Sequence, residues 1–210
     1  MTPPNDSEGD RAQRQREQRR KQILAAAKEV FAELGYHNAS ISDIIGRAGI
    51  ARGTFYLYFS SKRTVFDSIL DEALEELRTR ITRIDTSPGA DPPWAQLRGN
   101  LHRVMEYALA HPNFIKLLLS QGLGQDPEVT DRVADFYAHV VGRIGSSLRH
   151  GIEMGLVRPC DTAFVAAALL GAIRGIIDHL ITIEGPPDLD KVIDELMGFA
   201  LRGVLNTDRW

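Results

Sequence analysis

The chain has 210 residues, of which 43% are hydrophobic and 25% charged, and its net charge is -3. These values are ordinary for a soluble globular protein of one or two domains, and they exclude collagen-like, coiled-coil and wholly disordered chains. A single cysteine, Cys160, excludes an internal disulfide framework and is typical of a reducing compartment. Residues 1–21 lack the apolar core of a secretory signal, and the longest uncharged apolar run, 163–173, is too short to cross a bilayer. We therefore expect a cytoplasmic protein that does not enter a membrane.

The charge is distributed unevenly along the chain. Residues 1–63 hold 11 Lys and Arg against 7 Asp and Glu, whereas the remainder holds 14 against 21. Within 11–21, Glu17 alone opposes six basic residues. A basic end on an acidic protein indicates a polyanionic partner for that end, although a solvated charged tail has the same composition. Because residues 1–16 are poor in apolar side chains, we expect them to form a disordered basic tail.

Four helices are predicted over residues 17–77. The first runs from about Arg19 to Gly35, a residue suited to ending a helix. The second begins at Ser40, which can form a capping box with Asp43, and ends at Gly49. A short third helix covers about 51–59, and a fourth follows a serine cap at 60 or 61.

The sequence DTSPGADPP at 85–93 is the clearest break in the chain. Beyond it, the spacing of apolar residues predicts helices near 94–110, 113–123, 127–154, 161–183 and 188–205. No alternating strand pattern is present. The sequence therefore predicts an all-α protein of about nine helices, with an N-terminal domain at 17–77 and a larger helical domain at 78–210.

Two short helices joined by a glycine-containing turn, after a longer helix, are typical of a helix-turn-helix, here at 40–59. On the third helix, Phe55 and Phe59 share the face that we expect to be buried. Gly53 lies on the opposite face, where it lowers helix stability but lets another surface approach the backbone. We therefore predict that this face enters a DNA major groove. The candidate DNA-binding residues are Ser42, Arg47, Arg52, Gly53, Thr54, Tyr56, Leu57, Tyr58 and Lys62.

The order of residues in this segment resembles the DNA-binding domain of TetR-type transcriptional regulators. The resemblance covers about 17–77 and rests on ILAAA at 23–27, Phe31, Gly35-Tyr36, SISDII at 40–45 and AGIARGTFYLYFSSK at 48–62. It implies a dimeric repressor that binds a palindromic operator and is released by a small ligand. The chain departs from the family pattern at Ala51, which cannot cap the recognition helix, and at Ile45, which changes packing only.

The larger domain resembles the family more weakly. The residues His111-Pro112, Leu117–Leu119 and GLVRP at 155–159 are similar to those of regulators that sense apolar molecules, including acyl-type ligands. We expect the ligand pocket among Met105, Phe114, Leu118, Gln121, Phe136, Tyr137, Val140 and Ile144, although residues at this spacing also form ordinary core. No metal or other cofactor is expected, since the pair His102 and Glu106 lacks further metal-ligating residues at suitable spacing.

The last two predicted helices indicate a homodimer. The helix from residue 161 is apolar on nearly all sides, so it must be covered on all sides, and pairing with a second subunit achieves this simply. The expected interface residues are Leu169, Leu170, Ile173, Ile177, Leu196, Phe199, Ala200 and Val204.

Two other functions were weighed against DNA-binding regulation. An enzyme with its active site in the larger domain is disfavoured because the sequence lacks nucleophile-elbow, zinc, phosphate-loop and dinucleotide motifs. A protein-binding helical adaptor would leave Gly53 and the basic surface of Arg52 and Lys62 unexplained.

Overall fold

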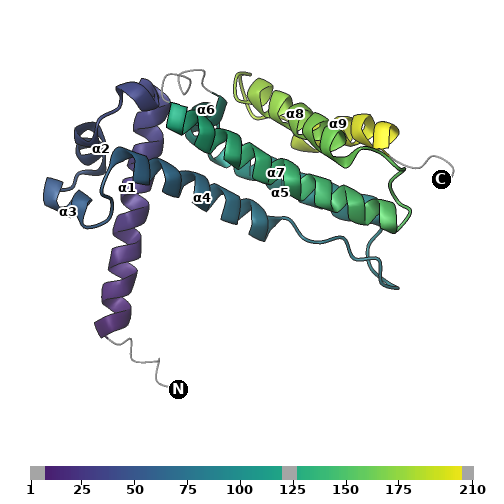
Figure 1. The fold of residues 1–210 in the computed structure, drawn as a ribbon, viewed down its shortest axis with the longest axis horizontal. Coiled ribbons are helices and arrows are strands. Elements are labelled where there is room, and N and C mark those ends of the chain that lie inside the picture. The colour runs from purple at the N-terminus through teal and green to yellow at the C-terminus, as the bar shows by residue number, and fades with distance from the viewer. Residues whose placement is uncertain (1–7, 120–126, 205–210) are drawn as a thin grey trace.

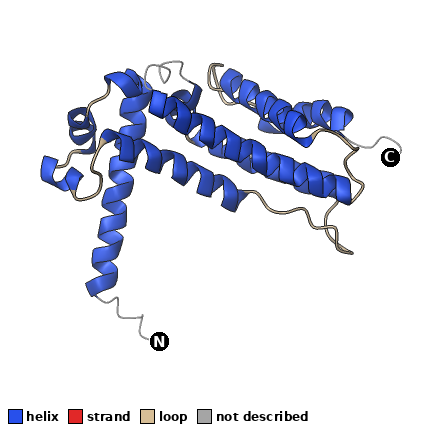
Figure 2. Ribbon diagram, viewed as in Figure 1, coloured by secondary structure: helices blue, strands red, loops and turns tan. Residues whose placement is uncertain are grey.

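The computed structural model describes residues 8–119 and 127–204 (Figure 1). All regular elements in these ranges are helices, which confirms the predicted all-α class (Figure 2). Their order is α1 (Glu8–Asn38), α2 (Ile41–Ala48), α3 (Arg52–Tyr56), α4 (Lys62–Arg80), α5 (Pro93–Ala110), α6 (Pro112–Leu119), α7 (Pro127–Glu153), α8 (Thr162–Leu180) and α9 (Leu189–Val204). Helices α1 to α3 and the start of α4 form a head, and α5 to α9 form a body beside the rest of α4.

The start of α1 differs from the prediction. Residues 8–16 are helical, so the expectation of a disordered tail over 1–16 is wrong for them, and residues 1–7 lie outside the described part of the chain. The reason is that extending an existing helix adds one hydrogen bond for each residue that is fixed, and Ala, Gln, Glu and Arg favour helix. Likewise, residues 120–123 of the helix predicted at 113–123 lie outside the described residues.

The predicted caps of the head are present. Ser40 and Asp43 form a capping box at the start of α2, and Gly49 ends that helix at φ 61°. Ser61 caps α4 through a reciprocal pair of hydrogen bonds with Thr64. These local contacts fix where α2 and α4 begin, and therefore the length of the segment that carries α3 between them.

The core of the head contains a group of aromatic side chains among its aliphatic residues. Phe31, Tyr36 and Phe66 are at most 4% exposed, and their ring centroids are 5.0–6.2 Å apart in tilted or edge-on contacts. Phe55 and Phe59 are also buried, with centroids 6.1 Å apart. This confirms the predicted inner face of α3, whose buried side chain joins the core cluster of the head while the helix itself packs against α2.

The body contacts the head through two routes. Helix α6 packs against α1, and α4 packs along α7. At the second contact, the Arg132 guanidinium on α7 donates to Asp67 Oδ1 at 2.9 Å and to Asp71 Oδ1 at 3.3 Å on α4. Helices α6 and α7 are therefore in direct contact with α1 and α4.

Helix α8 is more apolar than the sequence expectation allowed. It spans 19 residues with a mean hydropathy of 1.6, and among the described residues it is long and apolar enough to cross a membrane. The expectation considered uncharged runs only, whereas this helix includes the exposed residues Arg174 and Asp178. Ala166, Ile177 and Leu180 are buried, and one face of α8 is exposed and points outward from the protomer.

Candidate nucleic-acid interface

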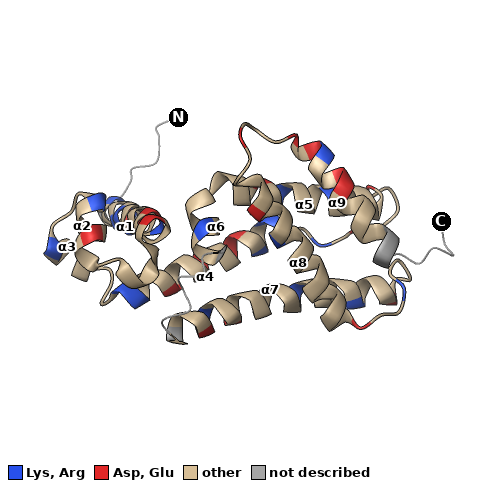
Figure 3. Ribbon diagram, turned by 90° about the horizontal axis from the view of Figure 1, so that it is seen from above, with Lys and Arg blue, Asp and Glu red and all other residues tan. Residues whose placement is uncertain are grey.

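Helix α3 exposes a small apolar and basic face opposite its buried phenylalanines. Arg52 and Gly53 are exposed, Tyr56 is 45% exposed and Leu57 73% exposed. A side chain as apolar and as exposed as Leu57 is suited to contact with another surface, such as a thymine methyl in the major groove. Figure 3 shows α2 and α3 at one end of the molecule, clear of the body.

The backbone of α3 is open at Gly53. A Cβ atom at this position would meet nothing within 4 Å, so packing inside the protomer does not require a glycine here. The absence of a side chain leaves the helix backbone accessible from outside. The first turn of α3 also lacks a side-chain cap at Ala51, as the sequence predicted, so its N–H groups are not satisfied by that residue.

The polar residues of α3 differ in their freedom to bind DNA. The Arg52 guanidinium carbon lies 5.8 Å from the centroid of the Tyr56 ring, so the two side chains form one exposed group. Thr54 and Tyr58 are half-buried, and Tyr58 packs against the core. Ser42 is exposed at the start of α2. These residues are brought to the same end of the head as predicted.

Lys62, one of the predicted DNA-binding residues, makes hydrogen bonds within the head. Its Nζ donates hydrogen bonds to the carbonyl oxygens of Tyr36 at 2.7 Å, Ala39 at 2.8 Å and His37 at 3.2 Å. It also lies 4.4 Å from the centroid of the Tyr36 ring. An ammonium has three donors, and three carbonyls at the end of α1 accept them. Lys62 therefore joins α4 to the end of α1, a tertiary contact that a sequence motif does not reveal.

Arg47 is also held within the head rather than free for a ligand. Its guanidinium donates to Glu33 Oε2 at 2.6 Å and to Glu29 Oε2 at 2.9 Å, both on α1. The hydrogen bond from Arg47 lowers the pKa of Glu33, so the pair stays charged at neutral pH. The predicted DNA contact by Arg47 is not supported by this geometry, because two carboxylates offset its charge.

The predicted pocket residues form packed core in this structure. Met105, Phe114, Leu118 and Phe136 are at most 8% exposed, and the rings of Phe114 and Phe136 meet edge-on with centroids 6.2 Å apart. Tyr137, Val140 and Ile144 are half-buried, and Gln121 lies outside the described residues. The structure thus favours the ordinary-core alternative for these positions as they stand. A ligand would have to separate the helices to enter here.

Few polar side chains in the described part of the chain border this core. The Tyr137 hydroxyl lies 3.5 Å from the carbonyl oxygen of Leu118, and the Arg174 guanidinium stacks 5.0 Å from the centroid of the Tyr137 ring. Burial raises the pKa of Tyr137, so it stays neutral at physiological pH. His102 Nδ1 and Glu106 Oε2 are 3.3 Å apart, and no group of three metal-ligating side chains occurs in the described ranges.

The predicted dimer residues are divided between core and surface. Ile177 and Leu196 are buried in the protomer, which argues against their prediction as interface residues, whereas Ile173 is half-buried and packs against the same core. Leu169, Leu170 and Ala200 are half-buried, Phe199 is 71% exposed, and the side chain of Val204 lies outside the description. The error arose because a helix that is apolar all round does not reveal which face points inward.

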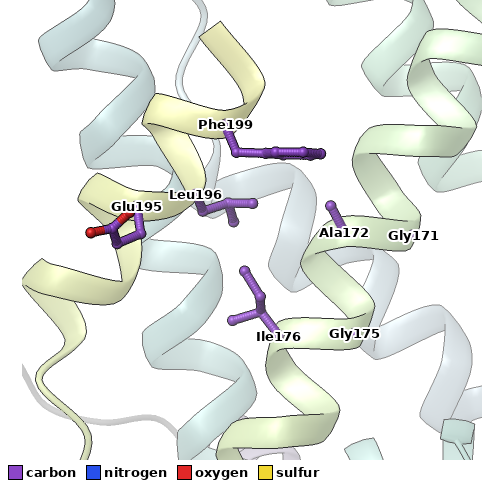
Figure 4. A pocket seen from close by; sticks show the side chains of 7 residues that line it. All are labelled: Gly171, Ala172, Gly175, Ile176, Glu195, Leu196 and Phe199. Atoms are coloured by element: carbon purple, nitrogen blue, oxygen red, sulfur yellow. The ribbon is translucent and has the colours of Figure 1, made fainter. Parts of the chain in front are cut away.

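The exposed apolar face of α8 is made of residues other than the predicted interface residues. They recur at helical spacing and are mostly small: Phe164, Ala167, Ala168, Gly171 and Gly175. An open apolar groove of about 340 Å³ lies between this face and α9. In Figure 4, the Phe199 ring reaches from α9 across the groove toward α8, while Glu195 points away from it. The small residues at intervals of three and four were the signal for this face.

Comparison with known proteins agrees with this architecture. Residues 23–69 match the family described as bacterial regulatory proteins of the tetR family, and residues 90–204 match the tetracyclin repressor-like C-terminal domain. Together these ranges include most of the head and most of the body.

Full-length relatives are transcriptional regulators. The fatty acid metabolism regulator protein of Bacillus subtilis is 40% identical over 187 residues, covering 88% of this chain and 95% of that protein. The uncharacterized HTH-type regulator YdgC of the same organism is 36% identical, covering 89% and 92%. A Clostridium perfringens structure assigned as a fatty acid metabolism regulator is 26% identical, with a TM-score of 0.76 and coverage of 89% and 100%. The chain therefore belongs to the TetR family of DNA-binding transcriptional regulators.

Proposed function

We propose that this TetR-family repressor acts in the cytoplasm as a homodimer, binds a palindromic operator through α3, and is released by an apolar acyl-type ligand. The observation that carries the ligand class is the 40% identity to a fatty acid metabolism regulator, which extends over 95% of that protein. It is supported by the apolar packing of α5, α6 and α7, which suits an alkyl chain better than a polar effector.

Dimerisation is supported by the outward face of α8. An exposed face of small apolar residues, with Phe199 beside it, is costly in water and is covered if a second protomer packs on it. Two α8 and two α9 helices would then form a four-helix interface. A palindromic operator requires the two-fold axis of this dimer to bring both heads to the same side.

DNA recognition is assigned to five residues of the head. Arg52, Tyr56 and Leu57 project from the exposed side of α3, Gly53 lets the backbone approach the bases, and Thr54 lies at the edge. Ser42 at the start of α2 and Tyr58 after α3 are candidates for phosphate contacts. Lys62 and Arg47 are left out of this set because their donors are directed into the head.

The release mechanism follows from the contacts between body and head. A ligand that enters among α5, α6 and α7 must displace residues that are now packed together, such as Phe114 and Phe136. Because α6 packs on α1 and α7 is paired with α4, the displacement changes the orientation of the head. Half-sites one helical turn apart require heads about 34–36 Å apart, so a shift of several ångströms weakens binding.

The test starts from an operator obtained by selection from random duplex DNA with the purified protein. Binding of this operator is followed by fluorescence anisotropy while a long-chain fatty acid, its CoA thioester, a short-chain acyl-CoA or free CoA is added. We expect release by a long-chain compound only. Release by none of them, with operator binding intact, contradicts the ligand class. Failure to select any DNA contradicts operator binding itself.

Two further measurements test DNA recognition and ligand-induced release separately. Arg52→Ala should weaken operator binding by about 1–3 kcal/mol, with relaxed sequence preference if the guanidinium contacts a base. Crosslinking the two heads at the spacing of the DNA-bound dimer should abolish release while leaving ligand binding unchanged. If the crosslinked protein is still released, a change in head separation is not the mechanism.

A further inference from the structure

One arginine at the border of the body core has no acidic partner in the described part of the chain. The guanidinium carbon of Arg174, on α8, lies 5.0 Å from the ring centroid of Tyr137, on α7. Arg174 is exposed, and it forms no hydrogen bond or ion pair with the described residues, including Asp178 one turn further along α8. A guanidinium has five N–H donors, and contact with a ring face uses none of them. These donors are therefore free to bind an acceptor from outside the chain.

Most other basic side chains around this core are engaged within the protomer. They pair with carboxylates or donate to neutral oxygens: Arg80 to Glu76, Arg98 to Asp190 and Asp194, Arg132 to Asp67 and Asp71, and Arg103 to Thr82, Asn100 and the carbonyl of Arg80. Lys116, Arg143 and Lys191 are exposed and stack on no ring of the described residues. Within the described body, Arg174 is thus the cation that touches a ring of the core and still lacks an anion.

A continuous series of ring contacts leads from Arg174 into the core. The Tyr137 ring meets that of Phe136 with centroids 5.6 Å apart, and Phe136 meets Phe114 at 6.2 Å. Tyr137 is half-buried, whereas Phe136 and Phe114 are at most 5% exposed. A polar group is costly to bury without hydrogen bonds. An alkyl chain lying among these rings would therefore have its polar end at Tyr137 and Arg174.

Tyr137 itself supplies a second donor at this end. Its hydroxyl lies 3.5 Å from the carbonyl oxygen of Leu118 on α6, whereas hydroxyl hydrogen bonds are usually about 2.7–2.8 Å long. Such a long contact is weak, so little is lost when the hydroxyl turns to an oxygen of a ligand. Tyr137 and Arg174 together offer O–H and N–H donors where the apolar core meets water.

This border lies away from the apolar groove between α8 and α9. Ala172 and Ile176 line that groove, and Figure 4 shows their side chains directed toward α9. Each is two residues from Arg174, which places both about 160° around α8 from it. Arg174 therefore belongs to the side of α8 next to α7 rather than to the groove.

We propose that Arg174 and Tyr137 bind the acyl oxygen of the ligand, while its alkyl chain lies along Phe136 toward Phe114. A fatty-acid carboxylate accepts a bidentate pair of charge-assisted bonds from a guanidinium, whereas the neutral carbonyl of a CoA thioester accepts weaker bonds. The acyl oxygen is common to both compounds, and the strength of the contact distinguishes them. This proposal rests on the acyl-type ligand proposed above.

The test measures ligand binding by isothermal titration calorimetry in the absence of DNA. The titrants are lauric acid, lauroyl-CoA and lauryl alcohol, which share an alkyl chain and differ at its polar end. Arg174→Gln should weaken binding of lauric acid by about tenfold and of lauroyl-CoA by about threefold, because a hydrogen bond to a charged oxygen is about twice as strong as a neutral one. Binding of lauryl alcohol, which has no acyl oxygen, should change by about twofold or less.

Two further variants sharpen the test. Tyr137→Phe keeps the ring beside Arg174 and removes only the hydroxyl, so both acyl compounds should bind about threefold more weakly. Arg143→Gln is the matched control: Arg143 is exposed on α7, six residues after Tyr137 and about 120° around the helix from it. It removes the same charge from a different side, and all three affinities should stay within about twofold of wild type. Circular dichroism checks that each variant is folded.

The outcomes are distinct. Unchanged binding of the acyl compounds by Arg174→Gln, or an equal loss for all three titrants, would overturn the contact and leave the ligand class intact. When both acyl compounds bind, a larger loss for lauroyl-CoA than for lauric acid would also overturn it, since the CoA phosphates rather than the acyl oxygen would then lie at Arg174. If wild-type protein binds one acyl compound alone, the loss expected for that compound decides the contact. If it binds neither, the acyl-type ligand fails and the contact fails with it.

Discussion

The substitution Lys62→Met tests whether this residue supports the head or binds DNA. In the structure, its ammonium donates to the carbonyl oxygens of Tyr36, His37 and Ala39, at 2.7, 3.2 and 2.8 Å. Methionine keeps much of the apolar stem but removes all three donors. Because α1 ends at these carbonyls, their loss leaves the junction between α1 and α2 without its cross-link to α4.

The magnitude follows from the geometry. A hydrogen bond to a charged group contributes about 1.5–3 kcal/mol. One ammonium shared by three acceptors, of which those of Tyr36 and Ala39 are the shorter contacts, contributes less than three such bonds. The stacking on Tyr36 adds about 0.5–1 kcal/mol. We expect the free energy of unfolding to fall by about 2–3 kcal/mol, and Tm to fall by about 4–12 °C for a chain of this size.

The assay is thermal unfolding by circular dichroism, together with operator affinity at a temperature where both proteins are folded. Arg52→Met is the control, since Arg52 is exposed on α3 and should affect affinity with little change in Tm. An unchanged Tm for Lys62→Met, with a loss of affinity like that of Arg52→Met, would refute the structural role and restore Lys62 as a phosphate contact.

Three more predictions concern the body. Phe199→Glu places a charge beside the exposed apolar face of α8 and should weaken dimerisation by about 2 kcal/mol or more, as measured by light scattering. The control Leu34→Glu, on the exposed side of α1, should leave the dimer intact. Burial raises the pKa of Tyr107 to about 12 from its ordinary value near 10, so the unfolded chain loses this proton at a lower pH than the folded chain. The free energy of unfolding should therefore fall by about 3 kcal/mol between pH 10 and 12, as measured by thermal melts at alkaline pH. The same fall in a Tyr107→Phe variant would contradict this. Arg132→Gln removes the ion pairs between α7 and α4 and should shift the ligand concentration needed for operator release by about fivefold. Arg149→Gln, elsewhere on α7, should leave that concentration unchanged. Equal release curves for the two variants would show that the contact between α7 and α4 does not couple ligand binding to release.

The sequence by itself determined the class of the fold and the recognition helix. Helical spacing, the Ser40–Asp43 capping box and Gly49 are local signals, because each depends on residues within one or two turns, and the structure has them where they were predicted. The inner face of α3 was predictable for the same reason, since Phe55 and Phe59 are one turn apart and too apolar to be exposed.

Only the tertiary structure decided which charges are free and which apolar faces are covered. In the sequence, Lys62 and Arg47 are basic residues close to the recognition helix. Their hydrogen-bond partners on or just after α1 are 14 to 26 residues away along the chain, so the sequence pattern does not reveal them. Helix α8 is apolar on nearly every side, so its inward face, with Ile177, depends on where α7 and α9 lie rather than on its own spacing. Residues 1–16 were predicted to be a disordered tail, but residues 8–16 are helical and project past α3 (Figure 1), because α1 is held by the core that follows.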